Sequence, residues 1–240
     1  MPNSHRSRTS EWFVPGFGPP KLRSFLGLLF LPYTGMVLSF LVLGSLLAPH
    51  LHWDRLLAIE VVYFFALGIG AHALDGLGRK GVKPWGAVFK RSQLWALAVS
   101  SLVVAYGLAI YYMVRYVPLL STLAVLEGFF VFAYNMEWFR GRFHTDNWFA
   151  FSWGFLPVLA GYMMQTNGAS LGAFLVGVAT SLFSLVEIKA SRPYKALKQR
   201  TDPLSDEEAS TMSRYEAILK GISMGVIFLA VGLLAHRVLS

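Results

Sequence analysis

Residues 24–48 read SFLGLLFLPYTGMVLSFLVLGSLLA and contain no charged side chain. A helix of about 20 mostly apolar residues crosses a hydrocarbon core of roughly 30 Å, so this run is long enough to span a membrane. The run is too long for the apolar part of a secretory signal peptide, and no clear small-residue cleavage site follows it. We therefore expect an uncleaved first membrane helix.

Six further apolar runs follow along the chain. They lie at residues 55–74, 93–113, 117–135, 147–164, 171–188 and 217–235. The loops between them are too short to fold as separate soluble domains. The sequence predicts an all-α, polytopic transmembrane helical bundle of about seven spans over residues 24–240. Residues 1–23 mix aromatic residues with prolines and predict a tail that lies at the membrane interface.

The charge distribution predicts how the bundle is oriented. The chain has a formal net charge of +8, but its basic residues lie in loops between apolar runs, which argues against a nucleic-acid groove. Eighteen of the 21 Lys and Arg residues lie in the tail and the loops of one side, and only Arg55, Arg115 and Arg237 lie on the other. This asymmetry predicts a cytoplasmic N-terminus and, after seven spans, a C-terminus outside. The absence of cysteine excludes disulfides, thiolate metal sites and a cysteine nucleophile.

Three of the predicted inner loops begin with an acid that is soon followed by a base. These sets are Asp75 with Arg79, Glu137 with Arg140, and Glu187 with Lys189 and Arg192. Acids and bases at helix ends are often only solvated or paired with each other. Three repeats at one membrane face nevertheless favour a shared polar site. In the last inner loop, Ser205 and Glu208 fit a capping box and predict a short surface helix before the seventh span.

Glu127 lies near the middle of its predicted span. A carboxylate at that depth is costly unless it is protonated, paired or facing a cavity. Glu127 shares a helix face with Tyr134, seven residues later. A hydrogen bond to a neighbouring helix and a role in an intramembrane cavity both remain open, and a transporter is a third, weaker possibility because it would rest on Glu127 alone.

Two local patterns suggest sites in the inner loops. Residues 76–81 read GLGRKG and match a dinucleotide-binding pattern, but that pattern has meaning only where a strand feeds a helix, so we exclude it. The glycines with Arg79 and Lys80 can still wrap a phosphate. His144 and Asp146 beside Glu137 suggest a metal site, but no second histidine stands at ligand spacing, which argues against zinc or iron.

Read from end to end, residues 20–235 resemble the UbiA superfamily of intramembrane prenyltransferases. Residues 71–79, AHALDGLGR, followed by KPWG at 83–86, stand in the place of that family's aspartate-rich motif N-D-x-x-D-x-x-x-D. Tyr134 with Arg140 is similar to the family's tyrosine and basic residue at the end of the fourth helix. Glu187 stands where the second acidic motif is expected. The family commonly has nine spans, whereas this chain offers about seven.

The resemblance implies a reaction and a cofactor. In the family, two acidic motifs hold Mg²⁺ ions, which bind the diphosphate of a polyprenyl donor and help it leave, so that an acceptor captures the allylic cation. Asp75 and Glu187 are the acids left at these positions here and are the implied metal ligands or proton-handling groups, with Tyr134 as the third catalytic candidate. Two carboxylates can anchor one Mg²⁺ whose remaining ligands are waters and phosphate oxygens. No other cofactor is implied.

The implied binding residues are cations for the phosphate and two groups for the cavity below it. They are Arg79, Lys80, Arg140, Lys189 and Arg192 for the phosphate, and His72 and Glu127 for the cavity. We expect a UbiA-like membrane protein that transfers or rearranges an isoprenoid whose phosphate head lies at the cytoplasmic face. The alternative is a non-catalytic protein that binds an isoprenoid or another membrane lipid, or a subunit of a membrane complex. Under the first reading, Asp75, Arg140 and Glu187 should converge at the inner face.

Overall fold

The computed structural model describes residues 11–78, 88–200 and 202–240, which form helices and, within those ranges, no strand. The helices are α1 (Pro20–Leu28), α2 (Leu31–Leu46), α3 (Trp53–Tyr63), η2 (Phe64–Ala71), α4 (His72–Asp75), α5 (Arg91–Arg115), α6 (Leu120–Asn135), α7 (Trp138–Gly141), α8 (Asp146–Ala150), η4 (Phe151–Phe155), α9 (Leu156–Thr166), α10 (Leu171–Lys198) and α11 (Asp206–Leu239). The segments η2 and η4 are π-helical. The prediction of an all-α fold is confirmed for the described residues.

Within the described residues, five helical segments are long and apolar enough to cross a membrane. They are Pro20–Leu46, Trp53–Asp75, Arg91–Arg115, Leu171–Lys198 and Asp206–Leu239. These segments are consistent with an integral membrane protein. The count of seven spans stays a prediction, because it requires that the shorter apolar helix α6 and the helical run of residues 146–166 also cross.

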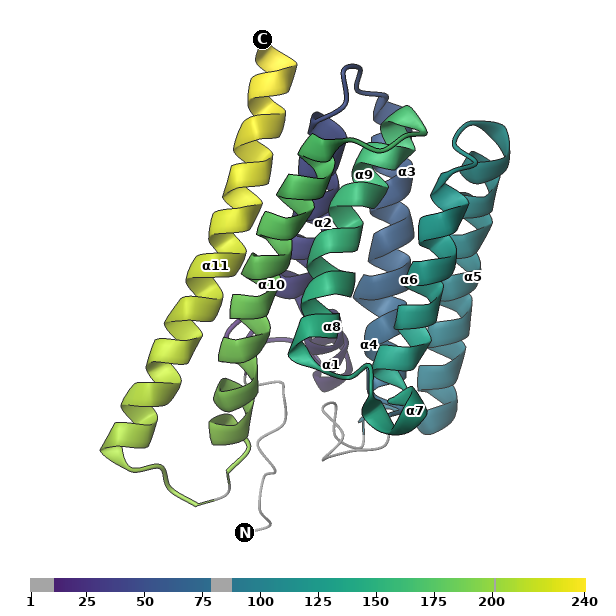
Figure 1. Cartoon of the computed structure of the whole chain (residues 1–240). Coiled ribbons are helices and arrows are strands. Elements are labelled where there is room, and N and C mark those ends of the chain that lie inside the picture. Colours follow the sequence, from purple (N-terminus) through teal and green to yellow (C-terminus); the bar gives the residue numbers. More distant parts are fainter. Residues whose placement is uncertain (1–10, 79–87, 201) are drawn as a thin grey trace.

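The long helices run side by side and place their connections at two ends (Figure 1). Helix α2 packs against α9 and α11, α10 packs against α11 and against the 146–166 run, and α3 with η2 packs on α5. Two glycines bring α2 and α9 together. A Cβ on Gly44 would collide with the carbonyl of Val158, and one on Gly161 would collide with the carbonyl of Leu41. Small residues permit this close backbone approach between membrane helices.

The first apolar run is not one continuous helix. Phe30 adopts a left-handed backbone conformation with φ of 43° and separates α1 from α2. Pro32 lies in the first turn of α2, where a missing N–H costs nothing because no intrahelical acceptor is lost. The hydroxyl of Thr34 donates to the carbonyl of Leu29 at 2.6 Å and satisfies one acceptor exposed by the break.

The last two spans are longer than the apolar runs that predicted them. Helix α10 does not end near Ile188 but continues through Pro193 to Lys198. The capping box is confirmed, since the N–H of Glu208 donates to Ser205 Oγ at 3.2 Å and the N–H of Ser205 donates to Glu208 Oε2 at 3.0 Å. The helix that it starts is not short, because α11 runs without a break into the seventh predicted span.

A small cluster of buried side chains lies where α1, α10 and α11 meet at one end of the bundle. Its members are Leu28, Phe30, Tyr33, Ala190, Tyr194 and Leu219. Phe13, from the segment before α1, packs against it. This end also carries α7 and the connection between α10 and α11 (Figure 1). We call it the basic end, because the described loops that are rich in Lys and Arg meet there.

Candidate functional site

A cavity of about 220 Å³ lies at the basic end of the bundle. Side chains from the α1–α2 junction, α4, α6, η4 and α10 line it, so segments distant in the chain contribute to one site. We call it the basic-end cavity. The π-helical segment η4 contributes Trp153 to its wall, and the π-helical segment η2 ends at the residue before His72. A π-helical segment inserts an extra residue into a helix, and such segments are frequent at functional sites.

One face of α10 supplies most of the charged lining. Glu187, Ser191, Arg192 and Lys195 all line the cavity. Their spacing of four, one and three residues places them on one side of a helix. Lys195 is not among the residues predicted from the sequence, because the sixth predicted span ends near Ile188. Continuing the helical face past that point would have found it.

Two carboxylates singled out from the sequence lie in the same cavity. Asp75 ends α4, and Glu187 on α10 has only 4% of its surface exposed. His72, three residues before Asp75, is also buried and lines the cavity. Tyr134 comes from the last turn of α6 and, like Arg192, is a further predicted residue that lines this cavity.

An ion pair holds the guanidinium of Arg192 at the cavity wall. Its Nε lies 2.9 Å from Oδ1 of Asp146, and Nζ of Lys189 lies 3.9 Å from Oδ2 of the same carboxylate. Asp146, considered above as a metal ligand, is thus a partner for two cations. The Lys189 side chain is 64% exposed and is not part of the cavity lining. Arg192 also interacts with the hydroxyl of Tyr134.

Aromatic rings form much of the remaining wall. The ring of His72 lies 4.9 Å from that of Phe30 and 5.3 Å from that of Trp153. The ammonium group of Lys195 lies 4.9 Å from the ring centre of Phe30 and 5.8 Å from that of Tyr33. A cation within about 6 Å of a ring is attracted to the face of the ring. The wall can therefore stabilise a positive charge, and Lys195 already occupies part of it.

His144 is held by contacts within the protein. Its ring stacks on that of Tyr134 at 4.4 Å, and its Nδ1 lies 3.0 Å from the backbone carbonyl oxygen of Tyr134. His144 lines the cavity. Asp146, the other residue considered with it for a metal site, is paired with Arg192 and is not among the lining residues. The described residues contain no group of three or more His, Asp or Glu side chains that could hold a metal ion.

Other predicted residues lie elsewhere. Arg140 belongs to the short helix α7, has a left-handed backbone with φ of 62°, and is exposed outside the cavity lining. The expected convergence therefore holds for Asp75 and Glu187 but not for Arg140. Arg79 and Lys80 lie outside the described residues, as do Gly81 and the segment that follows it up to residue 87.

Glu127 lies in a second, smaller cavity and not below Tyr134 in the first. This apolar cavity of about 50 Å³ lies between α3, η2, α5 and α6. The hydroxyl of Tyr63, on α3, donates to Glu127 Oε1 at 2.8 Å. Of the two roles left open by the sequence, the hydrogen bond to a neighbouring helix is therefore present. We call this space the Glu127 cavity.

The donor atoms of the basic-end cavity do not fit a pair of magnesium ions. Mg²⁺ favours an octahedral shell of oxygen ligands, and its protein sites use carboxylates together with substrate phosphates. The described lining offers the carboxylates of Asp75 and Glu187 but adds the cations Arg192 and Lys195. Positive side chains bind phosphate oxygens directly. The arrangement is thus suited to an anion held by protein cations, beside two acids able to exchange protons.

No protein-family model, curated protein or solved structure matches the chain.

Proposed function

We propose that this chain is a UbiA-like intramembrane protein that binds the phosphate head of an isoprenoid in the basic-end cavity and transfers or rearranges the prenyl group. One observation carries the proposal. Arg192 and Lys195 line the same cavity as Asp75 and Glu187, against a wall of aromatic rings. Such a site has a polar part for an anionic head and an aromatic part for a carbon chain.

The family resemblance supports the proposal through the positions of the two acids. Asp75 stands in the place of the first acidic motif and Glu187 in the place of the second, and both line one cavity although far apart in the chain. Tyr134, the third catalytic candidate, lines it as well. A chance set of helix-end acids would have no reason to meet in this way.

The proposed reaction is heterolysis of an allylic C–O bond. The electron pair leaves with the phosphate group, whose growing negative charge is stabilised by Arg192 and Lys195. The allylic cation left behind is sheltered by the faces of nearby aromatic rings such as Trp153. An acceptor then forms the new bond and loses a proton, which Glu187 or Asp75 is placed to accept. No step of this scheme requires a metal ion.

The proposed orientation places this cavity at the cytoplasmic face. The positive-inside bias assigns the loops of the basic end to the cytoplasm, and with seven spans the C-terminus lies outside. In Figure 1 the α11 C-terminus lies at the end opposite to α1 and α7. Labelling of tags at both ends of the chain in intact cells tests this arrangement, and tags on the same side would refute it.

A second candidate function is isoprenoid or lipid binding without catalysis. The observation that favours it is the small number of carboxylates, since Asp75 and Glu187 are the acidic residues that line the described cavity. Turnover separates the two candidates. Release of pyrophosphate from farnesyl diphosphate, lost in Glu187→Gln, supports catalysis, whereas binding without release supports the second function.

The binding experiment uses the whole protein in nanodiscs with farnesyl diphosphate, inorganic pyrophosphate and farnesol as probes. Lys195→Met should weaken farnesyl diphosphate binding by about 2 kcal/mol, the scale of a charge-assisted contact in a partly buried site. Lys189→Met is the matched control, because Lys189 lies on the same helix but outside the cavity lining. Equal effects of the two substitutions, or farnesol binding as tightly as the diphosphate, would contradict the proposal.

A further inference from the structure

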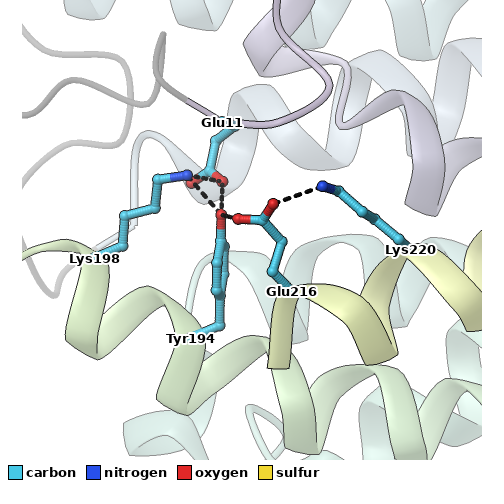
Figure 2. A network of polar contacts seen from close by, with 5 residues as sticks. All are labelled: Glu11, Tyr194, Lys198, Glu216 and Lys220. Atoms are coloured by element: carbon cyan, nitrogen blue, oxygen red, sulfur yellow. Dashed lines mark hydrogen bonds and ion pairs between the residues drawn. The ribbon is translucent and has the colours of Figure 1, made fainter. Parts of the chain in front are cut away.

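Residues 11–18, which precede α1, fold back onto the ends of α10 and α11. Figure 2 shows the polar network that holds them, with Glu11 facing Tyr194 and Lys198 of α10. Glu11 Oε2 lies 3.1 Å from the Tyr194 hydroxyl and 3.2 Å from Nζ of Lys198. The Tyr194 hydroxyl also lies 3.1 Å from Oε2 of Glu216 on α11. We call residues 11–18 the N-terminal strap.

The residues that hold the strap, Glu11, Tyr194 and Lys198, are largely buried, so the charges of Glu11 and Lys198 affect the stability of this contact. Glu11 is 6% exposed and Tyr194 is 1% exposed. The Lys198 side chain is 18% exposed, and its Nζ lies 2.5 Å from the Tyr194 hydroxyl. Removing one partner of a buried ion pair leaves the other charge uncompensated and is strongly destabilising for that contact. Glu11 is thus a buried charge whose pairing with Lys198 holds the strap on α10.

The docked strap supports the wall of the basic-end cavity. The ring of Phe13 lies 5.8 Å from that of Phe30 and 6.4 Å from that of Tyr33. Phe30 and Tyr33 line the cavity, whereas Phe13 is not among its lining residues, and Lys195 lies over the rings of Phe30 and Tyr33. A second contact holds the strap near α1, since Nε of Arg23 donates to the carbonyl of Pro15 at 2.7 Å. The strap therefore stands behind the aromatic wall and not within the cavity.

We propose that Glu11 is a positioning residue of the basic-end cavity, which acts by docking the strap so that Phe13 fixes the Phe30–Tyr33 wall and the ammonium group of Lys195. This inference rests on the proposed function of the cavity as an anion site. Outer residues that orient the groups in direct contact with a ligand commonly affect affinity without touching the ligand themselves. Phe30 has a strained left-handed backbone, so its position depends on the packing around it.

The chain has no cysteine, so a single introduced thiol reports on the cavity without a ligand. Ser191 lines the cavity and is 2% exposed. In a Ser191→Cys background in nanodiscs, we expect Glu11→Gln to raise the rate of modification by a charged methanethiosulfonate reagent about tenfold, because the wall opens more often. Glu11→Asp, which keeps the carboxylate, should restore much of the protection. Glu207→Gln is the control, because it removes the same charge from an exposed position on α11.

The second measurement is the affinity for inorganic pyrophosphate without the cysteine. Glu11→Gln should weaken it by roughly tenfold, the low end of the effects seen for outer-shell partners, and Glu207→Gln should leave it unchanged. An unchanged modification rate in Glu11→Gln overturns the inference, whatever the result of the pyrophosphate affinity measurement. A raised rate with unchanged pyrophosphate affinity also overturns it and leaves the proposed function intact. If the unsubstituted protein binds neither pyrophosphate nor farnesyl diphosphate, the proposed function fails and the positioning role fails with it.

Discussion

Among the described residues, the buried Glu187 and the partly buried Glu127 each lie at a cavity, and their surroundings differ sharply. Glu187 lies in the basic-end cavity with two cations, a second carboxylate and several aromatic rings. Glu127 lies in a cavity whose lining is apolar apart from tyrosines, and Tyr63 holds one of its oxygens. An acid in a predicted span is therefore not by itself evidence of a binding site for an anion. In the proposed function, the two cations distinguish the basic-end cavity from the Glu127 cavity.

The sizes of the two cavities support the same distinction. The basic-end cavity has about 220 Å³ of space and the Glu127 cavity about 50 Å³. A phosphate group brings negative charge that is costly to bury without hydrogen-bonding cations, and the Glu127 cavity offers none among its lining residues. Glu127 instead has the contact expected of a structural polar pair between helices.

The largest effect on ligand binding is expected from Arg192→Ala. This change removes a cation from the basic-end cavity and leaves Asp146 without its nearest partner. We expect farnesyl diphosphate binding in nanodiscs to weaken by about 2 kcal/mol or more. Glu127→Gln is the comparison, since it changes an acid at the other cavity and should leave binding unaffected. A loss of binding in Glu127→Gln that matches the loss in Arg192→Ala would remove the distinction between the cavities.

The next effect is on stability and concerns the Glu127 cavity. Tyr63→Phe removes the hydroxyl that donates to Glu127, and we expect the free energy of unfolding in detergent to fall by about 1 kcal/mol. The double variant Tyr63→Phe with Glu127→Leu should recover most of this loss, because no unsatisfied carboxyl remains. Diphosphate binding should not change in either variant. A Tyr63→Phe protein that unfolds normally but no longer binds would mean that this pair belongs to a binding site.

A smaller effect is expected from removing divalent metal. Because Arg192 and Lys195 line the basic-end cavity, farnesyl diphosphate should bind in EDTA with an affinity within about threefold of that in Mg²⁺. Titrations of the same nanodisc preparation with and without chelator measure the ratio. Binding that disappears in EDTA and returns with added Mg²⁺ would show that the metal carries the interaction.

The smallest effect is expected from Arg140→Ala. Arg140 is exposed on α7 and outside the lining of both cavities. Exposed charges contribute little, so farnesyl diphosphate affinity should remain within about twofold of the unsubstituted protein. The same titration used for Arg192→Ala gives the result. A loss comparable to that of Arg192→Ala would mean that the α7 segment moves over the cavity when ligand binds.

The helical bundle could be predicted because membrane spans depend on long apolar runs, and these are visible without tertiary contacts. The ends of the helices were harder to predict from the sequence. Helix α10 continues past its apolar run because Arg192 and Lys195 face a polar cavity, which composition alone does not show. The α1–α2 break at Phe30 was not predicted either, although Pro32 is a local signal for a helix start.

The candidate site could be predicted only in part. Asp75, Tyr134, Glu187 and Arg192 were found from the order of weak motifs, and all line one cavity. Arg140 was expected in the same cavity but lies outside it, because its position depends on the left-handed backbone of α7. Arg140 is not a glycine, so nothing in the sequence indicates that conformation at this residue. The docking of Glu11 on Tyr194 joins segments at opposite ends of the sequence, so no local pattern could reveal it.

The proposal depends above all on the phosphate head lying among the residues of the basic-end cavity, and photo-crosslinking tests this position most directly. An isoprenoid diphosphate analogue with a photoreactive group near the diphosphate is bound to the protein in nanodiscs, irradiated, and mapped by peptide mass spectrometry. We predict labelled peptides that contain α4 and residues 187–195 of α10, with labelling competed by unlabelled farnesyl diphosphate. Competed labelling confined to α3 and α6 around Glu127, with none on α10, would contradict the proposed position of the phosphate.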